Sequence, residues 1–448
     1  MKNSSEENNL GKNNNLFPQD ISNKTGLDNQ KPVIITESFE TKNNTTEKKD
    51  NNNIYSLKNK LIFIIIYYII IIWLETLYRN FLFDKSIPIQ EIIQKNESNS
   101  FLLKLSKILS IFGAEISTLF LFAIIFLFMP LNYSFLLLQA IVYSSYFTNT
   151  FKMIYQSDRP NWHSNYLTYS CNYGYGNPSG HSFTSISLYL SLSHCLIKFF
   201  KINGILRILI FILFIIFSLL IAISRFILAA HSLNQIIYGL SLGLGLYFIL
   251  IHILGYHKYS SLDFLGYIRR KKVNYCYYFL HSLLLLFTII VYIVTSPKDN
   301  SDFEQNIFNG IRCKVKNPYA KYENDGLFQS LSITSLIGAQ FGINILIYVL
   351  KKLNYLIGVS LIEWNKSKII KNYFLRIPVI LFSSIFILLY YIIPKDSPLI
   401  LIFIFKSGIP FFLAMFGIHF IGIYLCIYLK IANSEIYKMD ILHEITSS

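Results

Sequence analysis

The sequence has little charge for its length. Asp, Glu, Lys and Arg make up only 15% of its 448 residues, whereas hydrophobic residues make up 53%. A soluble globular domain carries about 25% charged residues, so this chain lacks the polar surface of a soluble protein. Cysteine is also scarce, and the five cysteines form no Cys-x-x-Cys pair. This argues against a zinc site and against a dense disulfide framework.

Acidic residues are the scarcer of the two charged classes. The chain has 40 Lys and Arg against 25 Asp and Glu, a formal net charge of +15. A basic balance can indicate binding to nucleic acid or to an anionic membrane surface. We favour the membrane, because the basic residues fall in loops between apolar runs. The expected partner is therefore the lipid bilayer, and no nucleic acid is expected.

The apolar runs predict an all-α fold, a polytopic transmembrane helix bundle of about ten spans. Residues 1–53 are rich in Asn and charge and predict a disordered cytoplasmic tail. Residues 54–430 form the predicted membrane domain, and residues 431–448 a short cytoplasmic tail. Each run has the length of about 20 residues that a bilayer requires, too long for buried strands. The predicted spans are 61–78, 113–130, 133–153, 182–200, 205–224, 232–254, 278–296, 328–350, 374–394 and 405–429.

Basic residues in the connecting loops predict the orientation. The 254–277 and 351–373 loops are strongly basic, so we expect them on the cytoplasmic side, with both termini. The loops at 79–112, 154–181 and 225–231 then lie on the opposite side. Cys171 and Cys313 also fall there, and both a disulfide and two free thiols stay open.

Three polar segments stand at the ends of apolar runs on that opposite side. They are Lys152–Pro160, Cys171–His181 and Ser224–Gln235. Three cations, Lys152, Arg159 and Arg225, come from these segments, and burying them together without a counter-charge would be costly. A shared anion is the natural partner. Pro178-Ser179-Gly180 precedes a predicted helix, whose first N–H groups would point at such an anion.

Two histidines complete the set. His181 and His231 each stand at the start of a predicted helix. An anion-binding cradle with two imidazoles can perform phosphoryl transfer, in which one imidazole attacks phosphorus and the other protonates the leaving oxygen. Gln235 follows His231 by four residues, on the same helical face. Its side-chain oxygen could accept the Nδ1–H of His231 and leave Nε2 free to attack.

These segments resemble the signature of the type 2 phosphatidic acid phosphatase superfamily, which includes vanadium haloperoxidases. The pattern K-x6-R-P matches Lys152–Pro160, P-S-G-H matches 178–181, and S-R-x5-H matches Ser224–His231. The superfamily usually has Asp where this chain has Gln235. A carboxylate would raise the basicity of the histidine, whereas an amide can only orient it.

Glucose-6-phosphatases resemble this chain more closely at that point. They have Leu-Ala-Ala-His followed by Gln at the fourth position, and a Cys and a Gly-x-Gly before P-S-G-H, as in Cys171 and Gly174-Tyr-Gly176. Four spans follow the nucleophile-bearing helix in those enzymes, as the spans over 278–429 do here. The resemblance covers about 130–430, with a catalytic core at about 130–255. It ends before the N-terminus, where this chain has a polar tail and one extra span.

The resemblance implies an integral membrane phosphatase of the endoplasmic reticulum, with a lumenal active site that hydrolyses glucose 6-phosphate as in gluconeogenesis. His231 would be the nucleophile that forms a phosphohistidine, and His181 the general acid. A sugar-phosphate transporter would be a partner, and neither a metal nor another cofactor would be required. The phosphate oxygens would be held by Lys152, Arg159, Ser179, Gly180 and Arg225.

Two alternatives stay open. The motifs hold phosphate and say little about the alcohol, so the substrate could be a lipid phosphate: phosphatidate, a sphingoid base phosphate or a polyprenyl diphosphate. The chain could also be an inactive scaffold or transporter. Gly239 and Gly243, in a G-x-x-x-G spacing after His231, are interpreted as close helix packing rather than as ligand contacts.

Overall fold

The structure is a computed structural model of the chain, and it describes the residues that surround all three polar segments. Most of the spans over 328–429, most of the 113–130 span, and the Cys171 and Cys313 thiols lie outside the described residues. Apart from scattered positions, the described ranges are 40–96, 101–114, 131–164, 166–167, 174–255 and 270–295.

Over these ranges the chain is helical and contains no strand. Four segments are long and apolar enough to cross a membrane: Leu57–Lys95, Gly204–Ile227, Leu233–Leu254 and Lys271–Thr295. The all-α membrane fold is thus supported, while the number of ten spans stays a prediction. The elements are α1 (Glu40–Asn96), α2 (Phe101–Ile111), α4 (Leu131–Tyr155), η1 (Pro160–Trp162), α5 (Gly180–Phe199), α6 (Gly204–Ile227), α7 (Leu233–Phe248), η2 (Ile249–Leu254) and α9 (Lys271–Thr295).

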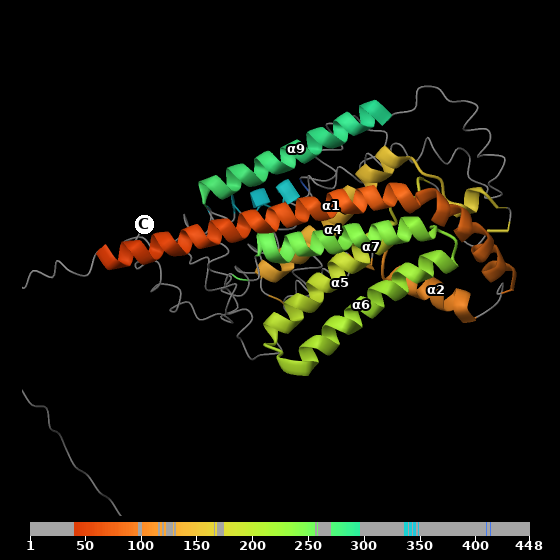
Figure 1. Cartoon of the computed structure of the whole chain (residues 1–448), viewed down its shortest axis with the longest axis horizontal. Helices are drawn as coiled ribbons and strands as arrows, with labels where there is room; N and C mark the ends of the chain where they lie inside the picture. Colours follow the sequence, from red (N-terminus) through yellow and green to blue (C-terminus); the bar gives the residue numbers. More distant parts are fainter. Residues whose placement is uncertain are drawn as a thin grey trace, which may run out of the picture. The chain divides into compact units, whose positions relative to one another are not determined.

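Helix α5 lies at the centre of a bundle with α4, α6 and α7, and α2 packs along α6 (Figure 1). The side chains of α5 are buried along almost its whole length, including its serines at 182, 185, 187, 191 and 193. Serine is small and can bond its hydroxyl to its own helix, as Ser187 does to the Phe183 carbonyl at 3.0 Å. Neighbouring helices can therefore approach α5 closely.

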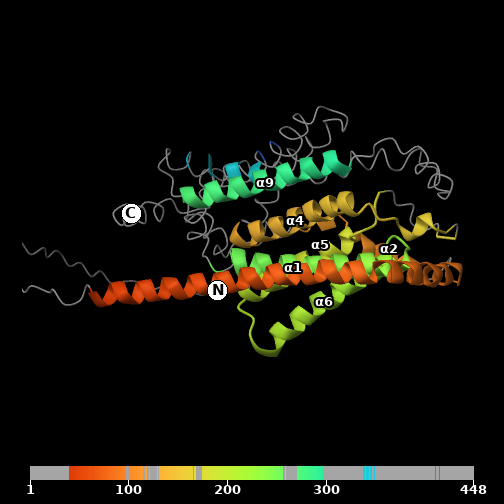
Figure 2. The same ribbon diagram turned by 45° about the horizontal axis from the view of Figure 1, so that its top comes forward.

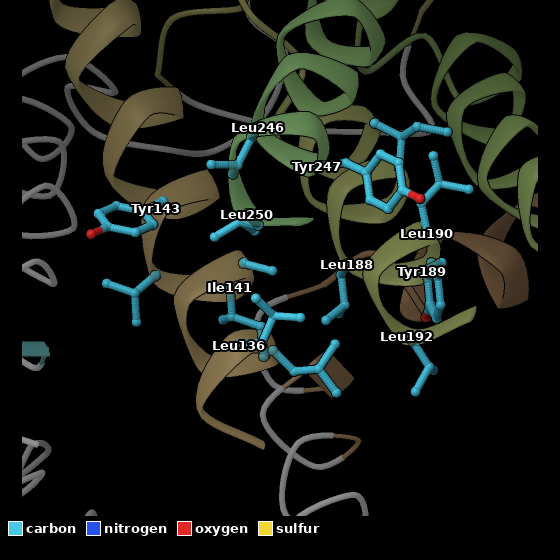
Figure 3. Close-up of a cluster of buried hydrophobic side chains, with 14 of the residues drawn as sticks. Leu136, Ile141, Tyr143, Leu188, Tyr189, Leu190, Leu192, Leu246, Tyr247 and Leu250 are labelled. Atoms are coloured by element: carbon cyan, nitrogen blue, oxygen red, sulfur yellow. The ribbon is translucent and has the colours of Figure 1, made fainter. Parts of the chain in front are cut away.

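The apolar core fills the space between α4, α5 and α7 (Figure 3). Leu136 from α4, Leu188 from α5 and Leu250 from η2 are almost completely buried. By contrast, α6 exposes one row of large apolar side chains, among them Ile205 and Leu213. Exposed apolar rows on a helix that is long enough to span are expected where the helix faces lipid.

Close packing between α5 and α7 depends on the two glycines of the G-x-x-x-G spacing. A β-carbon on Gly239 would lie 2.6 Å from the Ser179 carbonyl oxygen, and one on Gly243 would lie 2.5 Å from the Phe183 carbonyl oxygen. No real side chain fits at such distances. The interpretation of this spacing as helix packing is therefore confirmed for the described helices.

Helix α1 is longer than the sequence predicts. Residues 40–53 of the predicted disordered tail are helical, and the helix continues through the predicted loop to Asn96. The extension toward Asn96 follows from a row of polar side chains at intervals of four, Ser86, Gln90 and Gln94, which are buried rather than solvated. They bond to backbone groups near residue 230, for example Gln90 Nε2 to the Phe226 carbonyl at 3.1 Å. A polar stretch that the sequence predicts to be a loop is thus a helix whose polar side chains are buried.

Helix α9 packs beside α4 (Figure 2). The Tyr146 hydroxyl donates to the Leu284 carbonyl at 2.7 Å. His281 is completely buried, with Nδ1 2.7 Å from the Tyr277 carbonyl and Nε2 3.0 Å from the Tyr143 hydroxyl. Both ring nitrogens are satisfied, so His281 is a packed core histidine.

Candidate active site

The predicted site residues stand at the ends of four neighbouring helices. Lys152 lies in the last turn of α4 and Arg225 in the last turn of α6. His181 lies in the first turn of α5, and His231 in the short link between α6 and α7. The positive charges of Arg159, Arg225 and Lys152 act on both imidazoles. Three segments that are distant in the sequence therefore converge on one place.

A chain of hydrogen bonds holds the ring of His231. Its Nδ1 lies 3.1 Å from Gln235 Oε1, and the Gln235 Nε2 donates to the Asp158 carbonyl at 2.6 Å. Gln235 Oε1 also accepts the Ser232 N–H at 3.3 Å, as the third helical residue does in a capping box. Gln235 thus starts α7 and orients the imidazole at the same time.

Arg159 meets the opposite side of the same ring. Its Nη1 lies 3.3 Å from His231 Nε2 and donates to the Ala230 carbonyl at 2.7 Å. Its Nε donates to the Gly174 carbonyl at 2.5 Å. Gly174 has a φ of +83°, which an L side chain rarely adopts. This backbone turn presents the carbonyl that fixes the guanidinium.

These partners determine the tautomer of His231. A carbonyl oxygen can only accept, so the Gln235 amide must turn its nitrogen toward Asp158 and its oxygen toward His231. That oxygen in turn requires a hydrogen on Nδ1. A guanidinium can only donate, so Nε2 presents a lone pair. The network leaves Nε2 as the nucleophilic atom of the ring.

The environment of His231 also keeps the ring neutral. The side chain is buried, with 2% of its surface exposed. Burial, and after it the charges of Arg159 and Arg225, lower the pKa of His231 well below its ordinary value of 6.5. A neutral imidazole is the form that can attack an electrophile.

Arg225 supplies a buried positive charge. Its Nη1 donates to the Ser110 hydroxyl of α2, and Arg159 adds a second cation near it. Within the described ranges Arg225 makes no ion pair, and its Nε has no hydrogen-bond partner. A buried guanidinium without a counter-charge is costly, so the arrangement favours the binding of an anion.

The P-S-G-H segment begins α5. Ser179 is the N-cap: its hydroxyl accepts from the Ser182 N–H at 3.5 Å and from the Ser182 hydroxyl at 2.9 Å. The Ser179 N–H donates to the Gln235 carbonyl at 3.0 Å. Ser179 therefore joins α5 to α7, and its expected contact with phosphate stays a prediction. The N–H groups of Gly180 and His181 start the helix and have no acceptor within it, so they are better placed for an anion.

Several residues that support the site are missing from the sequence-based set. A β-carbon on Gly176 would lie 2.3 Å from Gln235 Nε2, so this glycine lets the loop close on the amide. A β-carbon on Gly113 would lie 2.9 Å from His181 Cδ2. Ser110 holds Arg225. The Gly-x-Gly spacing was the only sequence signal for any of these contacts, since the residues at 110–113 match no motif.

The arrangement combines a buried lone pair on nitrogen, a second imidazole and a cluster of cations. This equipment suits the transfer of an anionic group such as phosphoryl. Comparison with protein families agrees. Residues 133–259 match the family model of the PAP2 superfamily, and we call them the PAP2 domain. No curated protein and no solved structure matches the chain.

The PAP2 domain contains α4, α5, α6 and α7 and therefore both imidazoles and all three cations. A domain of this superfamily indicates phosphatase activity on phosphate esters. Helices α1 and α2, which contact the site through Gln90 and Ser110, lie before the matched residues.

Proposed function

We propose that the protein is an integral membrane phosphatase that hydrolyses glucose 6-phosphate to glucose and phosphate through a phosphohistidine. The observation that carries the mechanism is the network from Asp158 through Gln235 to His231 and Arg159. It aims the Nε2 lone pair of a neutral, buried imidazole at the place where the cations gather.

The reaction would proceed in two steps. In the first, His231 Nε2 forms a bond to phosphorus while the bond from phosphorus to the sugar oxygen breaks, and His181 gives that oxygen its proton. In the second, His181 takes a proton from water, whose oxygen attacks phosphorus and breaks the P–N bond. Arg159, Arg225 and Lys152 would neutralise the charge on the phosphoryl oxygens in both steps.

The choice of a sugar phosphate rests on two features shared with glucose-6-phosphatases, the Gln after His231 and the Gly-x-Gly before P-S-G-H. In the folded protein these features touch, because Gly176 packs against the Gln235 amide. They act as one unit around the nucleophile. This co-packing supports the assignment within the superfamily.

The test is phosphate release by the purified protein from a panel of glucose 6-phosphate, phosphatidate, a sphingoid base phosphate and a polyprenyl diphosphate. Glucose 6-phosphate should be hydrolysed fastest, and His231→Ala should abolish its hydrolysis. His252→Ala is the matched control, because His252 is an exposed histidine at the far end of the helical segment that follows His231. Faster hydrolysis of a lipid phosphate would replace glucose 6-phosphate as the proposed substrate. Phosphate release that survives in His231→Ala would refute the mechanism.

We place the enzyme in the endoplasmic reticulum membrane with its active site in the lumen, where a sugar-phosphate transporter would supply substrate. Intact microsomes should then hydrolyse glucose 6-phosphate more slowly than permeabilised ones. Asn96-Glu97-Ser98 is a glycosylation sequon at the end of α1, and glycosylation at Asn96 would mark the same side. Equal rates in intact and permeabilised vesicles would contradict a lumenal site.

A further inference from the structure

Helix α1 lies outside the PAP2 domain but contacts the loop that carries His231 and the loop that precedes His181. The Gln90 Nε2 donates to the His231 carbonyl at 2.8 Å, and the Ser86 hydroxyl accepts the Leu233 N–H at 3.0 Å. About three turns earlier on α1, Glu75 Oε1 accepts from Asn177 Nδ2 at 2.7 Å. Helix α1 thus contacts the His231 loop through Ser86 and Gln90, and the loop before P-S-G-H through Glu75.

Glu75 is an unusual residue for this helix. It is completely buried within a segment long and apolar enough to span a membrane. A carboxylate in such a place is costly unless it is paired and hydrogen-bonded. Arg79, one turn later, pairs with both carboxylate oxygens, with Nε 2.7 Å from Oε1. Its guanidinium also lies over the Tyr155 ring, 4.6 Å from the centroid.

The ion pair with Arg79 already neutralises the charge of Glu75, so burying this carboxylate requires no further hydrogen bond. The additional bond to Asn177 reaches out of α1 into the loop before α5. Asn177 is completely buried, and the next residues along the chain are the P-S-G-H motif. Backbone bonds hold the loop on either side of Asn177: the Gly176 N–H donates to the Ser157 carbonyl at 2.7 Å, and the Ser179 N–H donates to the Gln235 carbonyl at 3.0 Å. The bond to Glu75 adds a contact from α1 between these two points.

We infer that Glu75 is a positioning residue for His181 and that Gln90 is a positioning residue for His231, so that α1 is part of the catalytic apparatus. This inference rests on the proposed function. The two contacts should affect different chemistry. His181 gives a proton to the leaving oxygen, which matters only when the leaving group is a poor one, whereas attack by His231 is common to every substrate.

The test compares two substrates that share a phosphate but differ in the leaving group: glucose 6-phosphate, whose alkoxide must be protonated, and p-nitrophenyl phosphate, whose phenolate leaves without a proton. Glu75→Ala should lower kcat for glucose 6-phosphate by about tenfold or more, within the range of general acid catalysis. It should leave kcat for p-nitrophenyl phosphate within about twofold and KM for both unchanged. Gln90→Ala should slow both substrates equally.

Two further variants guard the interpretation. Asn177→Ala removes the same contact but keeps the ion pair of Glu75 with Arg79, so it leaves no unpaired buried charge and should reproduce the selective loss. Thr76→Ala is the matched control, because Thr76 is exposed beside Glu75 and its hydroxyl donates to the Trp73 carbonyl of α1 itself. An equal fall on both substrates in Glu75→Ala and Asn177→Ala would overturn the positioning role. Failure of the wild-type protein to hydrolyse either substrate would instead overturn the proposed function, and this inference with it.

Discussion

The substitution Gln235→Glu separates the chemistry of this site from the pattern of its superfamily. An acid at this position is usual in the superfamily, so the pattern alone predicts that Glu restores or raises activity. The structure predicts the opposite. Gln235 Nε2 donates to the Asp158 carbonyl at 2.6 Å, and a glutamate would place a second acceptor oxygen against that carbonyl.

The size of the loss follows from the hydrogen bonds involved. A carboxylate would strengthen the bond to His231 Nδ1 by about 1 kcal/mol, the difference between charged and neutral hydrogen bonds. Leaving the buried Asp158 carbonyl without its donor costs about 1–3 kcal/mol, and burying the new charge costs several kcal/mol more. The new charge would also compete with the substrate for Arg159. The burial cost alone exceeds the gain, so the loss felt at the transition state is at least that of the Asp158 hydrogen bond. A loss of about 1–3 kcal/mol lowers kcat about 5- to 150-fold.

The assay is phosphate release from glucose 6-phosphate at saturating substrate. Gln235→Leu, which loses all three side-chain hydrogen bonds of Gln235, should be at least as slow as Gln235→Glu. Ile237→Ala, on the same helix with 37% of its surface exposed, is the control for substitution in α7 and should match the wild-type protein. If Gln235→Glu works as fast as the wild-type enzyme or faster, the direction assigned to the Asp158 and His231 bonds is wrong.

Three other outcomes follow from the structure. The pKa of His231 lies well below 6.5 because of burial and nearby cations. As the pH is lowered, kcat/KM, corrected for the second ionisation of the substrate, should therefore not decline until the pH is below 6.5. A decline whose midpoint lies at pH 6.5 or above would contradict this. Gly176→Ala should lower kcat by at least about tenfold, since its β-carbon would displace the Gln235 amide; an unchanged rate would show that the loop can shift. Gly239→Ala should lower thermal stability by about 1–3 kcal/mol, since its β-carbon would press on the Ser179 carbonyl; an unchanged melting temperature would argue against close α5–α7 packing.

Part of the site could be predicted because it depends on local geometry. The spacing of four residues between His231 and Gln235 places both on one face of a helix start, and the structure has their side chains 3.1 Å apart. The G-x-x-x-G spacing predicted close packing for the same reason. The apolar runs predicted α6 and α7 because their length is set by the bilayer.

The remaining contacts have no local signature. Gln90 and Glu75 bond to groups about 100 residues or more away in the chain. In the sequence Gln90 belongs to a polar stretch that predicts a loop, and Glu75 is a lone charge within an apolar run. Which backbone carbonyl faces a polar side chain depends on how two helices pack. Because every residue has a carbonyl, the sequence does not mark the one that is bonded.

The sequence by itself determined the membrane class, the positions of the candidate site residues and the pairing of His231 with Gln235, because these depend on hydrophobic length and helical period. The tertiary structure alone decided that Ser179 joins two helices, that Arg225 bonds to Ser110, and that α1 contacts the loop of His231 and the loop before His181. Such contacts arise from the packing of helices that are distant in the chain, and hydrogen-bonding groups of the backbone carry no residue-specific mark in the sequence.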